Sequence, residues 1–148
     1  MPHGRGNLQY FKALEKYWKK RPNVHGFHSM LVNCELISAE PGRIKYEFPV
    51  LTQYTNPFGT LHGGCTFTLL DECLSNAIFD PEKHDKCQTG VTISMTISYL
   101  NGVRLGEKII IEAQKLREGK SFAFIEGNVY RKSDGIPVAL AQQTLALI

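Results

Sequence analysis

Residues 56–71 read Asn56-Pro-Phe-Gly-Thr-Leu-His-Gly-Gly-Cys-Thr-Phe-Thr-Leu-Leu-Asp71, and this segment decides the fold. A turn-prone loop leads into His62-Gly63-Gly64, which opens a long apolar helix. Glycines at a helix start let a ligand approach the backbone closely, and the first helical N–H groups have no partner inside the helix. Such groups can bind an anion or a developing oxyanion. Asp71 follows two turns later, so the segment combines a polarising site with a candidate base or nucleophile.

The helix expected over residues 61–79 is apolar on most sides, which is typical of a helix buried in a protein core. Its few polar positions are spaced four, three and four apart and form one stripe: Gly64, Thr68, Asp71 and Ser75. No apolar run reaches the ~20 residues that cross a bilayer, so no integral membrane segment is expected.

Alternating apolar residues predict six strands around this helix. They cover residues 29–38, 44–50, 91–99, 107–117, 121–131 and 137–147. Glu40-Pro41-Gly42-Arg43 is a suitable turn between the first two, because proline fixes φ and glycine accepts a positive φ. A sheet of this length around one apolar helix must curl over it, which makes the fold class α+β.

The N-terminal residues differ in charge from the rest of the chain. Residues 1–22 carry six Lys or Arg against one acidic residue, or +5, whereas the whole chain is +3 and the remainder therefore −2. The body of the chain is not a basic nucleic-acid binder. From Asn7, a suitable N-cap, the pattern predicts a basic amphipathic helix over about residues 7–20. We expect it to pack on the domain; a mitochondrial-type targeting helix and a membrane-surface helix are the alternatives.

Four cysteines show no metal-binding spacing: Cys34, Cys65, Cys73 and Cys87. We expect buried or free thiols in a reducing compartment, cytoplasmic or mitochondrial, with a disulfide or a zinc site as the alternatives. No cofactor and no metal are expected.

The order of elements and the His-Gly-Gly helix start resemble the hotdog fold. More narrowly, residues 26–148 resemble the acyl-CoA thioesterases of the PaaI and thioesterase superfamily member 2 type, with residues 1–25 as an N-terminal extension. The most specific parts are Asn56-x-x-Gly59-Thr60-Leu61-His62-Gly63-Gly64, Asp71 nine residues after His62, and Gly90-Val91-Thr92. The resemblance implies a long central helix wrapped by a curved six-stranded antiparallel sheet.

The resemblance also implies an active site between two subunits. Gly63 would offer its N–H to the thioester carbonyl, and Asn56 would orient and polarise that carbonyl. Asp71 of the facing subunit would activate water or attack directly, and Thr92 would help to hold the water. His62 would shape the loop and the helix start rather than act as a base.

For the substrate, the resemblance implies an acyl-CoA, with a medium or long fatty chain or an aryl group, hydrolysed to free acid and CoA in fatty acid metabolism. The residues expected to bind it are Gly64, Phe58, Lys120 and Arg117. The two cations would contact CoA phosphates; a solvated basic face is the alternative. The implied assembly is a homodimer with shared sites, extended to a homotetramer.

Thioester hydrolysis suits these residue types, because it needs an activated nucleophile and a stabilised oxyanion but little help for the thiolate leaving group. Asp71 lies about 13 Å from His62 along the helix axis, at ~1.5 Å per residue. One subunit therefore cannot place both groups on one carbonyl, which predicts an obligate dimer. The alternatives are a hotdog dehydratase or hydratase, which typically uses a catalytic histidine with an acid, and a non-catalytic acyl-CoA-binding module.

Overall fold

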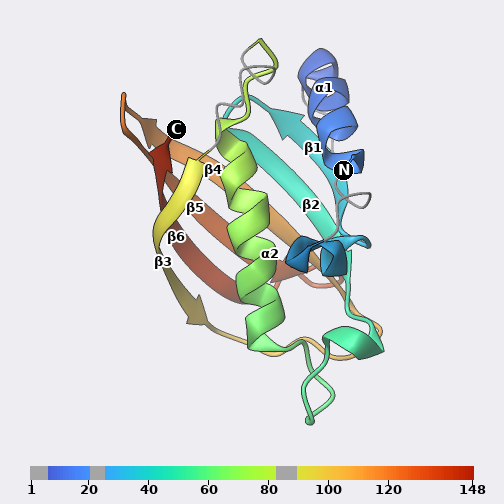
Figure 1. Ribbon diagram of the computed structural model, residues 1–148. Helices are drawn as coiled ribbons and strands as arrows, with labels where there is room; N and C mark the ends of the chain where they lie inside the picture. The colour runs from blue at the N-terminus through green and yellow to red at the C-terminus, as the bar shows by residue number, and fades with distance from the viewer. Residues whose placement is uncertain (1–6, 21–25, 83–89) are drawn as a thin grey trace.

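The computed structural model describes residues 7–20, 26–82 and 90–148 (Figure 1). The elements are α1 (Leu8–Lys19), η2 (Phe27–Leu31), β1 (Glu35–Glu40), β2 (Arg43–Pro49), η3 (Thr52–Tyr54), α2 (Gly63–Ser75), η4 (Asn76–Ile78), β3 (Gly90–Tyr99), β4 (Lys108–Glu118), β5 (Phe122–Arg131) and β6 (Pro137–Leu147). Within these described ranges, no helix has both the length and the apolar character needed to cross a bilayer.

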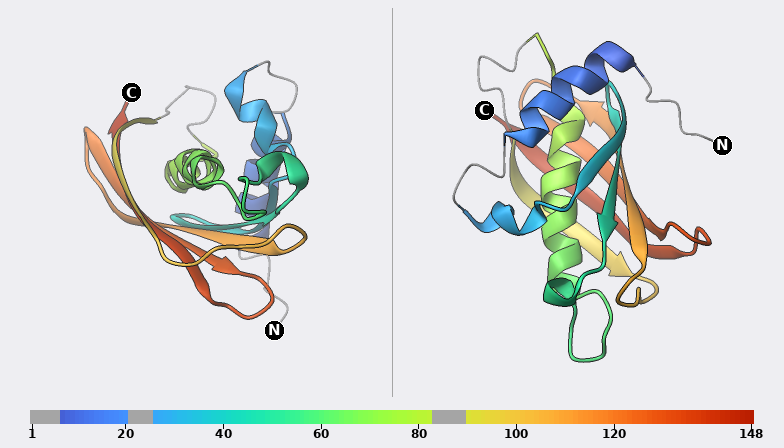
Figure 2. Two further views of the ribbon diagram at one scale, coloured as in Figure 1. Left: turned by 90° about the horizontal axis from the view of Figure 1, so that it is seen from below. Right: turned by 90° about the vertical axis from the view of Figure 1, so that its right-hand side faces the viewer.

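The strands form one antiparallel sheet in the order β1-β2-β4-β5-β6-β3. Seen along α2, the sheet curls around the helix and covers it from one side (Figure 2, left). This is the hotdog architecture, and it confirms the expected central helix wrapped by a curved six-stranded sheet.

The core lies between the concave face of the sheet and one face of α2. Inward-facing residues alternate along β2, where Ile44, Tyr46 and Phe48 are fully buried. The helix approaches the sheet most closely at Gly127 on β5. A Cβ atom there would lie 2.9 Å from the methyl carbons of Leu74, closer than real contacts allow, so glycine sets the spacing between α2 and the sheet.

Helix α1 packs on the domain, as expected from its apolar spacing. Asn7 caps it, because its Oδ1 accepts a hydrogen bond of 3.1 Å from the Tyr10 N–H. The buried face contributes Tyr10, Phe11, Leu14 and Trp18. The Trp18 Nε1–H donates to the Cys34 carbonyl oxygen at 2.8 Å, which ties α1 to the segment that enters β1.

The strand predicted over residues 29–38 is wrong in its first half. Phe27–Leu31 forms the 3₁₀ helix η2, and β1 begins only at Glu35. Leu31 and Cys34 are both buried and three residues apart, which is the period of a 3₁₀ helix, and the Cys34 N–H donates to the Leu31 carbonyl at 2.9 Å. The helix predicted over residues 61–79 is slightly shorter, since α2 ends at Ser75 and η4 continues it to Ile78.

Three of the cysteines are buried thiols, as predicted: Cys34, Cys65 and Cys73. The Sγ atoms of Cys34 and Cys73 lie 3.8 Å apart, well beyond the ~2.05 Å of a disulfide bond. Burial raises the pKa of the Cys65 thiol to about 11, with a smaller contribution from Cys34. Cys87 lies outside the described residues.

Strand β3 is an edge of the sheet. Among the described strands it pairs only with β6, so its other side presents unpaired backbone groups. Three of its side chains are more than half exposed although they are large and apolar: Val91 (51%), Ile93 (56%) and Tyr99 (54%). A long apolar edge of this kind is a template for pairing with another chain.

Candidate active site

The start of α2 is fixed by His62. This residue is the N-cap, and its Nδ1 accepts a hydrogen bond of 2.8 Å from the Gly64 N–H. Its carbonyl oxygen accepts from the N–H groups of Cys65 and Thr66 at 2.9 and 3.1 Å. The imidazole is therefore engaged in capping, and the Gly64 N–H is already used within the chain.

Gly63 is the first residue of α2, so its N–H is one of the donors that have no acceptor inside the helix. Its carbonyl oxygen accepts a hydrogen bond of 2.7 Å from the Tyr99 hydroxyl. A Cβ atom at Gly63 would meet the Tyr99 ring at 3.4 Å. Burial raises the pKa of the Tyr99 hydroxyl. The hydrogen bond from Tyr99, the last residue of β3, thus connects this strand to the start of α2.

Asn56 organises the loop before the helix. Its Oδ1 accepts from the N–H groups of Phe58 and Thr60 at 3.0 and 3.2 Å, and its Nδ2 donates to the Thr60 hydroxyl at 2.8 Å. Gly59 has the positive φ of 76° that the turn requires. One Nδ2 hydrogen of Asn56 is used by the Thr60 hydroxyl, and the other is available to a ligand. Phe58 stands at the loop tip and is 88% exposed.

Asp71 lies half-buried on the polar stripe of α2. The Thr92 hydroxyl donates to Asp71 Oδ1 at 2.7 Å, and the Ser75 hydroxyl donates to the Asp71 carbonyl oxygen at 2.7 Å. The structure thus brings together the carboxylate and the threonine that the resemblance implied, from α2 and β3.

Gln143 on β6 completes this cluster and was missed by the sequence analysis. It is only 1% exposed, and its Nε2 donates to Thr92 Oγ1 at 2.9 Å and to Ser75 Oγ at 3.2 Å. The same nitrogen makes longer contacts of 3.3 Å with Asp71 Oδ1 and with the Asp71 carbonyl oxygen. The Thr92 and Ser75 hydroxyls both donate their hydrogens to oxygens of Asp71, so each can accept only through its oxygen. The two amide hydrogens of Gln143 supply these two donors, and the direction of every hydrogen bond in the cluster is then set. Among the described residues, no donor lies within hydrogen-bonding distance of Gln143 Oε1.

The site residues fall into two clusters at different turns of α2. Asn56, His62 and Gly63 form one cluster at the helix start, and Asp71 with Thr92 forms the other. Gly63 and Asp71 are eight residues apart, or about 12 Å along the helix. A single subunit therefore presents two separate clusters, which strand β3 connects through Thr92 near one end and Tyr99 at the other. On the expectation of a site shared between two subunits, each cluster is one half-site.

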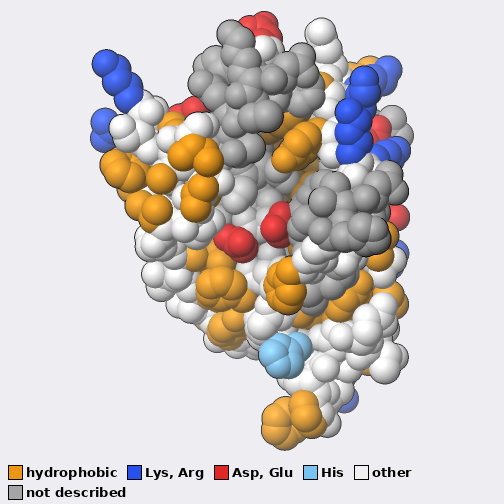
Figure 3. Space-filling model, in the orientation of Figure 1, with side chains coloured by type: hydrophobic (Ala, Val, Ile, Leu, Met, Phe, Trp, Pro, Cys, Tyr) orange, Lys and Arg blue, Asp and Glu red, His pale blue; other side chains and the backbone are white. Residues whose placement is uncertain are grey.

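Charged residues lie around the Asp71 half-site. In the space-filling view, acidic side chains are visible in a hollow on this face of the molecule (Figure 3). Lys120 lines the same cavity as Asp71, whereas Arg117 is exposed and lies outside the lining. Within the described part of the chain, no three His, Cys, Asp or Glu side chains are grouped so that they could hold a metal ion.

A donor at a helix start and a hydrogen-bonded carboxylate are groups that thioester hydrolysis uses, and the comparisons with known proteins identify the class of the chain. Residues 58–138 match the family model of the thioesterase superfamily. The chain is 34% identical to human acyl-coenzyme A thioesterase 13 over 133 residues, which cover 90% of this chain and 93% of that protein. The chain therefore belongs to the thioesterase superfamily.

Solved structures agree with this membership. The structure of zebrafish thioesterase superfamily member 2 superposes with a TM-score of 0.83 at 34% identity, covering 91% of this chain and 96% of that one. The Escherichia coli PaaI protein superposes with a TM-score of 0.72 at 19% identity, covering 92% and 95%, and this likeness concerns the fold alone.

Proposed function

We propose that this chain hydrolyses acyl-CoA thioesters to free acid and CoA without a metal ion. The observation that carries the proposal is the carboxylate of Asp71, held by Thr92 at 2.7 Å beside an open cavity. The relative named acyl-coenzyme A thioesterase 13 supports CoA as the carrier of the acyl group.

In the proposed reaction, Asp71 acts as a general base on water. The described hydrogen bonds to the carboxylate reach Oδ1, which leaves Oδ2 to take a proton as the water oxygen attacks the thioester carbonyl. The Gly63 N–H stabilises the oxyanion, and one such donor is typically worth ~10²–10³ in rate. The C–S bond then breaks, and the thiolate takes up the proton. Direct attack by Asp71 would instead form an anhydride, which water cleaves.

The proposal requires two copies of the chain, and strand β3 supports a specific pairing. Full antiparallel overlap of Gly90–Tyr99 with its copy would set Thr92 opposite the partner's Ile97, two residues from the partner's Tyr99. Thr92 holds Asp71 and Tyr99 holds Gly63, so this pairing would bring Asp71 of one copy to Gly63 of the other. We propose such a homodimer, and two of them as a tetramer, in the cytoplasm or in mitochondria.

The test is a thiol-release assay with short, long and aryl acyl-CoAs. Asp71→Asn and Asp71→Ala are expected to lose most of kcat while the fold persists by circular dichroism. The matched control is Glu72→Gln, which neutralises the neighbouring carboxylate and should keep most of the activity. Wild-type turnover in both Asp71 variants would refute the assignment.

Two other outcomes would replace the proposed reaction. Tight acyl-CoA binding without thiol release would identify a binding module. Loss of water from a 3-hydroxyacyl thioester, with the thioester bond intact, would identify a dehydratase.

A further inference from the structure

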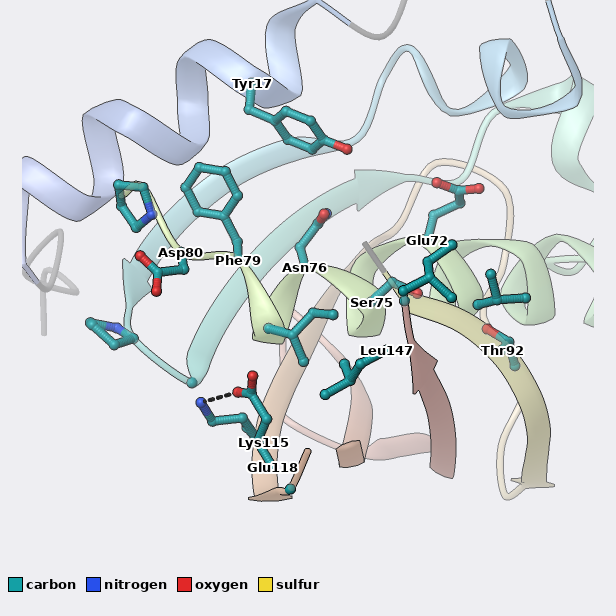
Figure 4. Close-up of a pocket in the computed structure, with 18 of the residues that line it drawn as sticks. Tyr17, Glu72, Ser75, Asn76, Phe79, Asp80, Thr92, Lys115, Glu118 and Leu147 are labelled. Atoms are coloured by element: carbon teal, nitrogen blue, oxygen red, sulfur yellow. Dashed lines mark hydrogen bonds and ion pairs between the residues drawn. The ribbon is translucent and has the colours of Figure 1, made fainter. Parts of the chain in front are cut away.

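A groove with a volume of about 1190 Å³ begins at Asp71 and Thr92 and runs past η4 to α1. Figure 4 shows its course from Thr92, past Ser75 and Asn76, to Phe79 and Tyr17. The volume lies above the ~300–1,000 Å³ of common small-molecule sites. The groove therefore offers room for a large part of a substrate directly beside the carboxylate.

The floor of the groove is apolar, and its far end combines the Phe79 ring with the neighbouring Asp80 carboxylate (Figure 4). Ile78, Phe79 and Leu147 are partly buried side chains that line it. At the far end, the Phe79 ring contacts two rings of α1: its centroid lies 5.5 Å from that of Tyr17 and 5.8 Å from that of Tyr10. Helix α1 thus supplies the wall that closes the groove.

The charge of the groove argues against the nucleotide part of CoA. Its lining includes two lysines, Lys115 and Lys120, and four carboxylates, Asp71, Glu72, Asp80 and Glu118, a formal balance of −2. Lys115 is also paired with Glu118 at 2.8 Å. Phosphates bind where cations dominate, so the groove as a whole is a poor site for them. An uncharged acyl chain that lies on the apolar floor is not repelled by these carboxylates.

We infer that this groove holds the acyl chain and that the ring pair of Tyr17 and Phe79 limits its length. The inference rests on the proposed function and extends it to chain selection. Phe79 directly follows η4. The four residues from Asp71 to Ser75 rise about 6 Å at ~1.5 Å per residue, and the three residues of η4 add about 6 Å at ~2.0 Å per residue, so Phe79 begins about 12 Å from Asp71. An extended chain advances about 1.2 Å per bond, so about ten bonds reach the wall. A medium-length acyl group therefore spans the groove from Asp71 to the ring pair, and α1 determines the limit.

The test measures kcat/KM for straight-chain acyl-CoAs of increasing length. In the wild-type protein kcat/KM should rise about fourfold for each added methylene, as expected for burial of apolar surface, and stop rising near ten bonds. Phe79→Ala and Tyr17→Ala should move this break to longer chains and leave the shortest substrates unchanged. Ile78→Trp, which fills the floor, should move the break to shorter chains.

The matched control is Leu8→Ala, since Leu8 lies on α1, is 49% exposed and is outside the groove lining. Its length profile should equal that of the wild type. If Phe79→Ala does not fold, Tyr17→Ala decides, because Tyr17 is 36% exposed. Thiol release with the wild-type profile in every groove variant would overturn the inference alone. No thiol release from any acyl-CoA would overturn the proposed function.

Discussion

Replacing Gln143 by leucine separates the two effects of this buried amide. The change keeps a side chain of similar size but removes the two donors that reach Thr92 Oγ1 at 2.9 Å and Ser75 Oγ at 3.2 Å. It also removes Oε1, which is buried and has no donor among the described residues. We expect a protein of nearly normal stability and reduced activity.

The expected stability change is small because two terms oppose each other. Two lost hydrogen bonds cost about 2 kcal/mol, at ~1 kcal/mol each, and removal of an unpaired buried oxygen recovers ~1–3 kcal/mol. The free energy of unfolding should stay within about 1 kcal/mol of wild type. Without its donor, the Thr92 hydroxyl no longer has a fixed direction toward Asp71. A hydrogen bond to a charged group is worth ~1.5–3 kcal/mol, so kcat should fall between about tenfold and about 150-fold.

Urea denaturation measures the first quantity, and thiol release from an acyl-CoA measures the second. The matched control is Gln142→Leu, the neighbouring glutamine on β6, whose side chain is exposed. A loss of stability above about 3 kcal/mol would mean that Oε1 is paired in the protein. An unchanged kcat would show that the amide does not position Thr92 and Asp71.

Three further changes test the packing of the fold. Gly127→Ala places a Cβ atom 2.9 Å from Leu74 and should cost about 1–3 kcal/mol in urea denaturation; an unchanged midpoint would contradict the close approach. Trp18→Phe removes the N–H that donates to the Cys34 carbonyl oxygen at 2.8 Å. The free energy of unfolding, followed by circular dichroism, should fall by about 1–3 kcal/mol, and an unchanged value would show that this bond does not hold α1 on the domain. The Cys65 thiol, with its pKa raised from 9.0 to about 11, stays protonated in the folded chain while the unfolded chain ionises, so stability should fall as the pH rises over this interval. Cys65→Ala should remove that fall, and the same slope in this variant would assign it to another group.

Local patterns were sufficient for most of the fold. The apolar stripe and its polar interruptions predicted α2, and period-two alternation predicted five of the six strands within one or two residues. The exception is residues 29–34, where Met30, Val32 and Cys34 alternate along the sequence and so fit a strand pattern when read alone, although the chain forms η2 there and β1 begins only at Glu35. Only the packing of Leu31 and Cys34 against the core separates the two interpretations.

The site was predictable only where its residues are close in sequence or carried by the family resemblance. His62, Gly63 and Asp71 belong to one segment, whereas Gln143 is 72 residues from Asp71 and 51 from Thr92. A contact over such distances depends on the strand order, which places β6 beside β3. The signal available in the sequence was a polar residue between Ala141 and Leu145 on the inward face of β6.

Strand β3 carries one half-site near each end, and this arrangement has a genetic consequence. When copies pair through β3 as proposed, an Asp71→Asn subunit still supplies an unchanged Gly63 N–H, and a Gly63→Val subunit still supplies an unchanged Asp71 carboxylate. In an equal mixture of the two inactive proteins, about half of the dimers are mixed and each mixed dimer has one intact site, so about a quarter of the wild-type activity should return. Two defective alleles of one gene would then rescue each other, whereas two copies of either allele would not.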